Sequence, residues 1–203
     1  MSPAGRKAIV YLHGFLSAPA SRKAMLLTDY VRNCVSDIDC VVPALGDRPA
    51  RAIEQAASAC APYASADLTL MGSSLGGFYA TVLAERLGCR AVLLNPAVHP
   101  HRHFERYLGA QRNLYTGEGF VLTREHIEEL AALDVATITQ PGRYWLVVET
   151  GDEVLDYREA VAYYAGAFDT IVRGGDHALS SFAEHVPDLV DWALGATEAR
   201  SAS

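Results

Sequence analysis

Short apolar runs alternate with segments of helical periodicity along most of the chain. Most runs are rich in β-branched or aromatic residues and lack polar alternation, which is typical of strands buried on both faces of a parallel sheet. Six runs fit this description: AIVYLH (8–13), CVVPAL (40–45), LTLMGS (68–73), AVLLN (91–95), YWLVVE (144–149) and DTIVRG (169–174). They predict a six-stranded, mostly parallel sheet.

Apolar residues at helical spacing lie between these runs. They predict helices over 27–34, 53–60 and 80–87, and Gly88 is expected to end the third. Two more helices are expected, one from Asp156 to Gly166 and one from Ser181. Because Pro187 falls inside the last pattern, we predict a short first turn and a restart at the proline. The alternation of strands and helices predicts a doubly wound α/β fold with helices flanking the sheet.

The length of 203 residues suits one domain, which we place at residues 1–195. Residues 96–141 separate two predicted strands and are too many for a simple crossover. They contain one helix-like piece, at about 123–133, after a polar stretch dotted with aromatic residues. We interpret 96–141 as a lid-like insertion over the carboxyl edge of the sheet, and 196–203 as a disordered tail.

Charge and composition narrow the class of protein. The net charge of −7 and the absence of a Lys/Arg run argue against nucleic-acid binding. No apolar run approaches the roughly 18 residues that span a bilayer, and the N-terminal residues lack a signal-peptide pattern. The cysteines form no C-x-x-C pair and have apolar neighbours, which predicts buried free thiols at Cys34, Cys40, Cys60 and Cys89. These features together predict a cytoplasmic protein.

The stretch Gly72-Ser73-Ser74-Leu75-Gly76 stands where a predicted strand meets a predicted helix. It fits the pattern G-x-S-x-G, in which small residues at −2 and +2 permit a sharp turn that presents the central serine. Glycine-rich turns also occur in α/β proteins for packing alone, so the pentapeptide is weak by itself. The flanking strand and amphipathic helix favour Ser74 as a nucleophile.

A serine nucleophile needs a base to accept its proton and an acid to orient that base. His177 lies on a glycine-loosened loop just past the last predicted strand, from which it could reach the serine. Asp152 directly follows a buried strand, at the carboxyl edge of the sheet. The order Ser74, Asp152, His177 is that of α/β-hydrolases.

Other acids compete with Asp152 for the orienting role. Asp156 resembles a helix N-cap, and Asp176 is adjacent to the histidine, from which neighbouring loop side chains usually diverge. Glu153 remains a second alternative. The sequence ranks Asp152 first without excluding these three.

The backbone N–H groups of Phe15 and Leu75 are the expected oxyanion-hole donors. Phe15 follows His13-Gly14 at the end of the first strand, and Leu75 begins the helix after the serine turn. We expect Ser21 to cap the next helix, and the His13 side chain to bond loop backbone. The residues that could line an acyl pocket are His13, Tyr107, Tyr115 and Phe120.

Three alternating histidines, His99, His101 and His103, raise the question of a metal. Two imidazoles in an H-x-H pattern can share one ion. No Cys, Asp or Glu at ligand spacing accompanies them, and Pro100 interrupts the pattern. A loop at the pocket rim is therefore expected, with no metal.

Several blocks of the sequence resemble the YqiA-type esterases of the α/β-hydrolase superfamily. They are YLHGF, GSSLGG, LNPAV, YTGE, ETGDEVLDYREAVAYY and GGDHAL, spread over nearly the whole chain. The resemblance implies hydrolysis of small carboxylic esters or acyl thioesters without a cofactor, and places nucleophile, acid and base on Ser74, Asp152 and His177. An acyltransferase with the same triad and a non-catalytic, partner-binding member of the fold are the two alternatives. The oligomeric state is not predicted.

Overall fold

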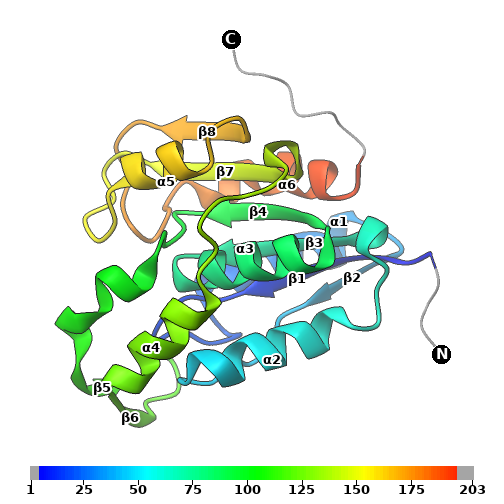
Figure 1. Cartoon of the computed structure of the whole chain (residues 1–203). Coiled ribbons are helices and arrows are strands. Elements are labelled where there is room, and N and C mark those ends of the chain that lie inside the picture. Colours follow the sequence, from blue (N-terminus) through cyan, green and yellow to red (C-terminus); the bar gives the residue numbers. More distant parts are fainter. Residues whose placement is uncertain (1–4, 196–203) are drawn as a thin grey trace.

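The computed structural model describes residues 5–195, which form six parallel strands between two layers of helices (Figure 1). The strand order is β2-β1-β3-β4-β7-β8, and every neighbouring pair is parallel. The strands are β1 (Lys7–Leu12), β2 (Ile38–Val41), β3 (Leu68–Ser73), β4 (Arg90–Leu94), β7 (Tyr144–Glu149) and β8 (Phe168–Val172). The predicted doubly wound, six-stranded α/β fold is confirmed.

Both faces of this sheet are buried, as the uninterrupted apolar runs predicted. In β1, Ala8, Val10 and Leu12 pack on one face, and Ile9 and Tyr11 pack on the other, because successive side chains point to opposite sides. The helices are α1 (Arg22–Cys34), α2 (Pro49–Cys60), α3 (Leu75–Leu87), α4 (Arg124–Leu133), α5 (Tyr157–Tyr163) and α6 (Phe182–Ala193), of which α4 packs on α2. Helices α1 and α6 contribute to one core cluster, and α2 and α3 to the other.

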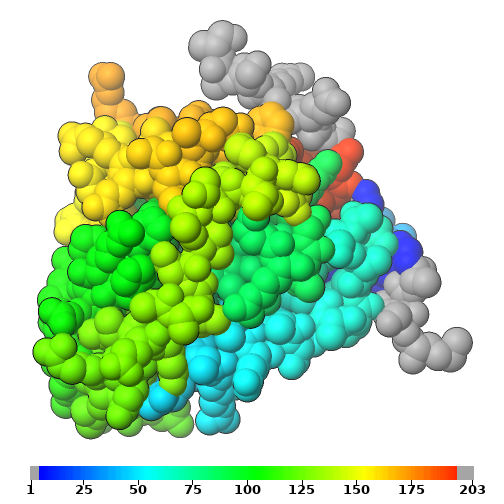
Figure 2. All heavy atoms as spheres, in the orientation of Figure 1, coloured from blue at the N-terminus to red at the C-terminus, as the bar shows by residue number. Residues whose placement is uncertain are grey.

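The segment between β4 and β7 carries α4, short 3-10 turns and a separate antiparallel hairpin. The hairpin strands are β5 (Gly109–Arg112) and β6 (Gly119–Leu122). Figure 2 shows the yellow-green chain of α4 and its continuation crossing one face of the molecule beside the cyan α2. The helix-like piece at 123–133 is confirmed, whereas the hairpin was not predicted.

Helix α6 departs from the prediction because it runs unbroken through Pro187. The proline removes one backbone hydrogen bond and crowds the preceding turn, at a cost of about 3 kcal/mol in a helix interior. The same helix buries five large side chains against the sheet: Phe182, Val186, Leu189, Val190 and Trp192. Their packing outweighs the local penalty, so the predicted restart at Pro187 is wrong.

Other predicted boundaries shift for local reasons. Strand β2 ends at Val41, before Pro43, because proline cannot donate to a strand ladder. Helix α5 ends at Tyr163, three residues before Gly166, where φ is +88°. Ser21 occupies the N-cap position of α1, but its hydroxyl makes no capping hydrogen bond, so that prediction is only half right. Gly88 ends α3 in the left-handed region, as expected.

All four cysteines are free, but only two are buried. Cys60 and Cys89 are inside the core, and burial raises the pKa of the Cys60 thiol to about 12. Cys34 is exposed and Cys40 is half-buried, which corrects the prediction that all four are buried. Within residues 5–195, no helix is both long and apolar enough to cross a bilayer.

Candidate active site

Ser74 stands at the turn between β3 and α3 with φ +54° and ψ −121°, a backbone conformation that side-chain-bearing residues rarely adopt. The turn is possible because the residues two positions before and after Ser74 are glycines, which have no side chains. A Cβ atom added to Gly72 would lie 2.6 Å from the Gly76 carbonyl carbon, and one added to Gly76 would lie 2.7 Å from the His13 carbonyl oxygen. The two glycines therefore let the nucleophile turn form against the end of β1.

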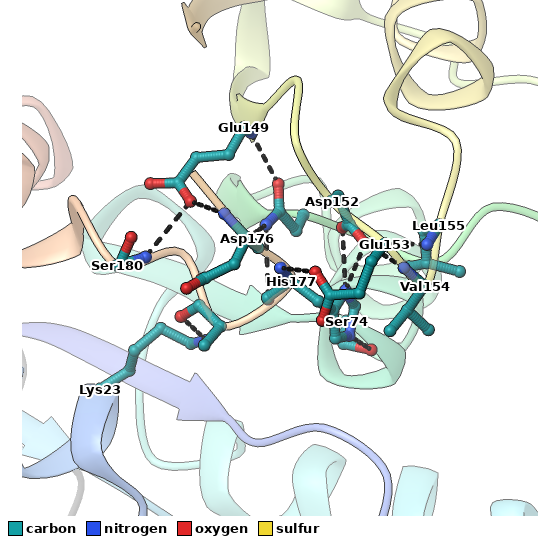
Figure 3. Close-up of polar contacts among 12 residues, drawn as sticks. Lys23, Ser74, Glu149, Asp152, Glu153, Val154, Leu155, Asp176, His177 and Ser180 are labelled. Atoms are coloured by element: carbon teal, nitrogen blue, oxygen red, sulfur yellow. Dashed lines mark hydrogen bonds and ion pairs between the residues drawn. The ribbon is translucent and has the colours of Figure 1, made fainter. Parts of the chain in front are cut away.

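The structure brings Ser74, His177 and Asp152 together from three places in the chain (Figure 3). The His177 Nε2 atom lies 3.0 Å from the Ser74 hydroxyl oxygen. The His177 Nδ1 atom lies 2.8 and 3.0 Å from the two carboxylate oxygens of Asp152. With a proton on Nδ1, the imidazole donates to Asp152 and is free to accept the serine proton at Nε2.

The contacts of the other candidate acids differ from those of Asp152. Glu153 accepts the backbone N–H of His177 at 2.9 Å and does not contact its ring. Asp156 caps α5 by accepting the Arg158 N–H, as expected from its position. The carboxylate of Asp176 makes no contact with the imidazole within 4 Å. Of these four acids, Asp152 is the one whose carboxylate contacts the His177 ring.

The Asp152 carboxylate is nearly inaccessible, with 2% of its side chain exposed. Burial alone raises its pKa, but the hydrogen bond with His177 and those from the Leu155 and Val154 N–H groups reverse that effect. The net result is a pKa below the ordinary value. Asp152 therefore stays ionised at neutral pH and can stabilise an imidazolium.

The two expected oxyanion donors flank the serine. Gly14 is packed against it, since an added Cβ would lie 3.2 Å from the Ser74 Cβ atom. Phe15 follows directly, and Leu75 is the first residue of α3. Among the residues that the structure describes, neither the Phe15 nor the Leu75 N–H donates to another protein group. Both amides are thus available to an oxygen bound beside Ser74.

Two cavities lie on either side of the segment 14–17. The smaller, of about 370 Å³, contains Ser74, His177 and Tyr115 in its wall. The larger, of about 610 Å³, is lined by His13, Leu75 and Phe120. Residues Gly14, Phe15, Leu16 and Ser17 line both cavities. The segment that carries one expected oxyanion donor therefore forms a wall shared by two possible binding spaces.

The predicted lining residues divide between these spaces, with one exception. His13 and Phe120 line the larger cavity and Tyr115 lines the smaller. Tyr107 lines neither cavity. Its ring packs on Phe15 and Phe104, with its centroid 5.6 and 5.4 Å from theirs, and so joins the insertion to the loop after β1.

His13 also has a structural role. Its Nε2 atom accepts the Leu45 N–H at 3.2 Å, and its Nδ1 atom lies 3.1 Å from the Gly14 carbonyl oxygen. Burial lowers the pKa of His13, and the Gly14 contact opposes this only partly. A neutral imidazole with its proton on Nδ1 satisfies both contacts and fixes the start of segment 14–17.

Each of the three alternating histidines lies near an acid, and His99 makes a hydrogen bond with it. His99 Nδ1 lies 2.8 Å from both carboxylate oxygens of Asp134, and His101 Nδ1 is 3.7 Å from the same carboxylate. His103 Nε2 lies 3.7 Å from Glu159. Between residues 5 and 195 no group of three or more His, Cys, Asp or Glu side chains is arranged to hold a metal ion.

Sequence reasoning missed two buried polar residues next to this site. Asn95 follows β4 and Glu149 ends β7, and their exposed fractions are 3% and 1%. Both belong to otherwise apolar runs, AVLLN and YWLVVE. The detectable signal was a polar residue at the carboxyl end of each of these buried strands.

A model of the uncharacterised protein family UPF0227 matches residues 8–194. The chain belongs to this family. UPF0227 is the YqiA-like family, so the resemblance found in the sequence is confirmed at the level of the family.

Solved structures with the α/β-hydrolase fold resemble this UPF0227 member. A protein of Agrobacterium vitis S4, provisionally assigned as a hydrolase, is 19% identical, with 93% of this chain and 88% of that chain covered and a TM-score of 0.73. Mouse alpha/beta hydrolase domain-containing protein 10 is 15% identical, with 91% and 90% covered and a TM-score of 0.70. Est1E from Butyrivibrio proteoclasticus is 13% identical, with 93% and 88% covered and a TM-score of 0.66. At these identities the likeness shows the fold.

Proposed function

We propose that this protein is a serine hydrolase that cleaves small carboxylic esters or acyl thioesters through an acyl-enzyme. The observation that carries the proposal is the hydrogen-bonded chain from the Ser74 hydroxyl through His177 to Asp152, at a strained strand-to-helix turn. Membership of the YqiA-like family supports it, as does the Agrobacterium vitis protein of the same fold that is provisionally assigned as a hydrolase. Action in the cytoplasm stays a prediction from the sequence.

In the proposed first half-reaction, the Ser74 oxygen attacks the acyl carbonyl while His177 Nε2 accepts the hydroxyl proton. The carbonyl π pair moves to the oxygen, and the Phe15 and Leu75 N–H groups donate to this oxyanion. Each such donor contributes about 3 kcal/mol in comparable sites. The oxyanion then collapses, the bond to the alkoxide or thiolate leaving group breaks, and His177 returns its proton to that group.

Water completes the cycle. His177 removes a proton from the water as it attacks the acyl-enzyme, and the serine leaves with that proton. An alcohol or amine in place of the water would make the protein an acyltransferase. We also propose that residues 96–141 cover the site, supported by the hydrogen bond from the Asn113 side chain to the Ser17 carbonyl oxygen at 2.8 Å.

The decisive experiment is a panel of p-nitrophenyl acyl esters and acyl thioesters assayed with the wild type, Ser74→Ala and a matched control, Ser58→Ala. Ser58 lies on α2 and bonds only the Glu54 carbonyl oxygen. We expect hydrolysis by the wild type and Ser58→Ala, and loss of it in Ser74→Ala with an unchanged thermal midpoint. Full activity in Ser74→Ala would refute the proposal. If the wild type hydrolyses neither substrate and does not react with a fluorophosphonate probe, a non-catalytic binding protein is favoured. If added alcohols or amines become acylated, a transferase is favoured.

A further inference from the structure

The loop between β8 and α6, residues 173–181, carries His177 but has little regular structure of its own. Gly174, Gly175 and Leu179 have φ of +81°, +73° and +54°, and most of the loop lies at or near the surface. Its internal backbone bonds include the one from the Leu179 N–H to the Asp176 carbonyl oxygen. His177 is mounted on this loop, so keeping its ring within hydrogen-bonding distance of Ser74 requires contacts from residues outside the loop.

Glu149 supplies four of these contacts. Its Oε2 atom accepts the N–H groups of Asp176 at 2.6 Å and Ser180 at 3.3 Å, as Figure 3 shows. Its Oε1 atom accepts the N–H of Ser181 at 2.9 Å and the Ser181 hydroxyl at 2.5 Å. One side chain therefore holds the loop on both sides of His177.

The loop and the carboxylate are fitted to each other. A Cβ atom on Gly175 would lie 2.7 Å from the Glu149 Cγ atom, so only glycine allows this approach. Burial raises the pKa of Glu149, but the bonds from Ser181 and the loop amides outweigh it and bring the pKa below its ordinary value. The carboxylate is thus ionised at neutral pH and accepts four hydrogen bonds as an anion, which makes them stronger.

Asn95 holds the same loop from the neighbouring strand. Its Nδ2 atom donates to the carbonyl oxygens of Asp176 at 3.0 Å and His177 at 3.4 Å. Its Oδ1 atom accepts the Glu149 N–H at 2.9 Å. The amide thereby joins the end of β4, the end of β7 and the backbone on which the imidazole is mounted.

We propose that Glu149, supported by Asn95, is a positioning residue that holds the His177 backbone so that its Nε2 atom meets the Ser74 hydroxyl. This inference rests on the proposed serine hydrolase function. Glu149 does not touch the reacting atoms, because its carboxylate bonds loop N–H groups and the Ser181 hydroxyl, whereas the imidazole contacts Asp152 and Ser74. Without the carboxylate, three backbone N–H groups and one hydroxyl lose their acceptor, and the loop relaxes. A shift of about 1 Å at a catalytic group costs roughly 100-fold in rate.

The test compares Glu149→Gln and Glu149→Ala with Glu85→Gln. Glu85 is a matched control because it is also a largely buried carboxylate, accepting the Thr139 N–H and the Tyr144 hydroxyl, and it does not contact the loop. With p-nitrophenyl acetate, we expect kcat to fall 10- to 100-fold in Glu149→Gln and further in Glu149→Ala, with KM within twofold. Glu85→Gln should keep kcat within twofold despite a similar loss in thermal midpoint.

A second readout does not depend on turnover. Hydrogen exchange of peptides covering 173–181 should become faster in Glu149→Gln but not in Glu85→Gln. If the Glu149 variants fail to fold, Asn95→Asp and Ser181→Ala should give the same local increase, and Ser181→Ala about a threefold loss in kcat. The proposal would be overturned if hydrogen exchange of 173–181 were unchanged in Glu149→Gln. It would also be overturned if kcat fell in proportion to the thermal midpoint to the same extent in Glu149→Gln and Glu85→Gln. If the wild type does not turn over any ester or thioester, the proposed hydrolase function is wrong. The hydrogen-exchange measurement still tests whether Glu149 positions the loop.

Discussion

Asp152 presents both carboxylate oxygens to the Nδ1 atom of His177, at 3.0 and 2.8 Å. Two backbone N–H groups, those of Val154 and Leu155, donate to the Oδ1 atom at 2.8 Å and hold the carboxylate in place. The imidazole therefore has one favoured orientation and one favoured tautomer, with its unprotonated nitrogen toward the serine.

Replacing Asp152 with Asn should lower kcat by about 10³- to 10⁴-fold, because an amide can donate to Nδ1 and favour the wrong tautomer. The fold should survive, since the Asn Oδ1 atom can still accept the two backbone N–H groups. Steady-state kinetics with a chromogenic ester and circular dichroism measure both effects. A loss below tenfold would direct attention to Glu153, which lies beside the same histidine.

Ser74 should be a strained position whose relief stabilises the protein. In Ser74→Gly we expect the free energy of unfolding to rise by about 1 kcal/mol, because glycine adopts the observed φ and ψ without steric cost. Urea unfolding measures the change. Ser58→Gly, in the helix α2, is the matched comparison and should lower stability by about 0.5 kcal/mol. Equal destabilisation by both substitutions would contradict the assignment of strain to Ser74.

Gly76 is predicted to tolerate no side chain. Gly76→Ala should destabilise the protein by more than about 2 kcal/mol, because its Cβ would overlap the backbone at the end of β1. Gly142→Ala is the control, since nothing lies within 4 Å of a Cβ built there. Thermal unfolding of the two variants should differ clearly, and similar midpoints would mean that the turn can open.

Stability should fall on acidification as Asp152 and Glu149 are protonated. Both have native pKa values below their ordinary values of 3.8 and 4.5, so the unfolded chain binds protons more readily near these pH values. Their contribution is complete above about pH 5.5 and is lost as the pH falls through the depressed native pKa values. Urea unfolding between pH 7 and pH 3 should give a shallower acid slope in Glu149→Gln than in the wild type. An unchanged slope would show that Glu149 does not titrate as proposed.

The sheet was predictable from sequence because buried parallel strands leave long apolar runs that few other structures produce. The run 68–73 coincides with β3, and 144–149 with β7. The hairpin β5–β6 was not predictable in this way, because β5 carries no apolar run and the run in β6 is only three residues long. Its turn is instead set by Asn113, whose side chain accepts the N–H groups of Tyr115 and Thr116.

The candidate site was predictable where chemistry restricts the residue type. Ser74 and His177 stood out by residue type and by their neighbouring glycines, and the structure brings them within 3.0 Å. Tyr107 was misplaced because an aromatic residue gives the same signal whether it lines a cavity or packs on other rings. The role of Glu149 was missed because the sequence does not show which loop packs against a glutamate at the end of a strand. Such long-range pairing is decided only by the assembled fold.

The wall formed by Gly14, Phe15, Leu16 and Ser17 has a consequence for selectivity. If the two halves of a cleaved substrate occupy the separate cavities beside this wall, different side chains contact each half and limit its size. Tolerance for the size of the departing group and tolerance for the length of the retained chain would then be independent traits. Enlarging one chamber would broaden one of them and leave the other as it was.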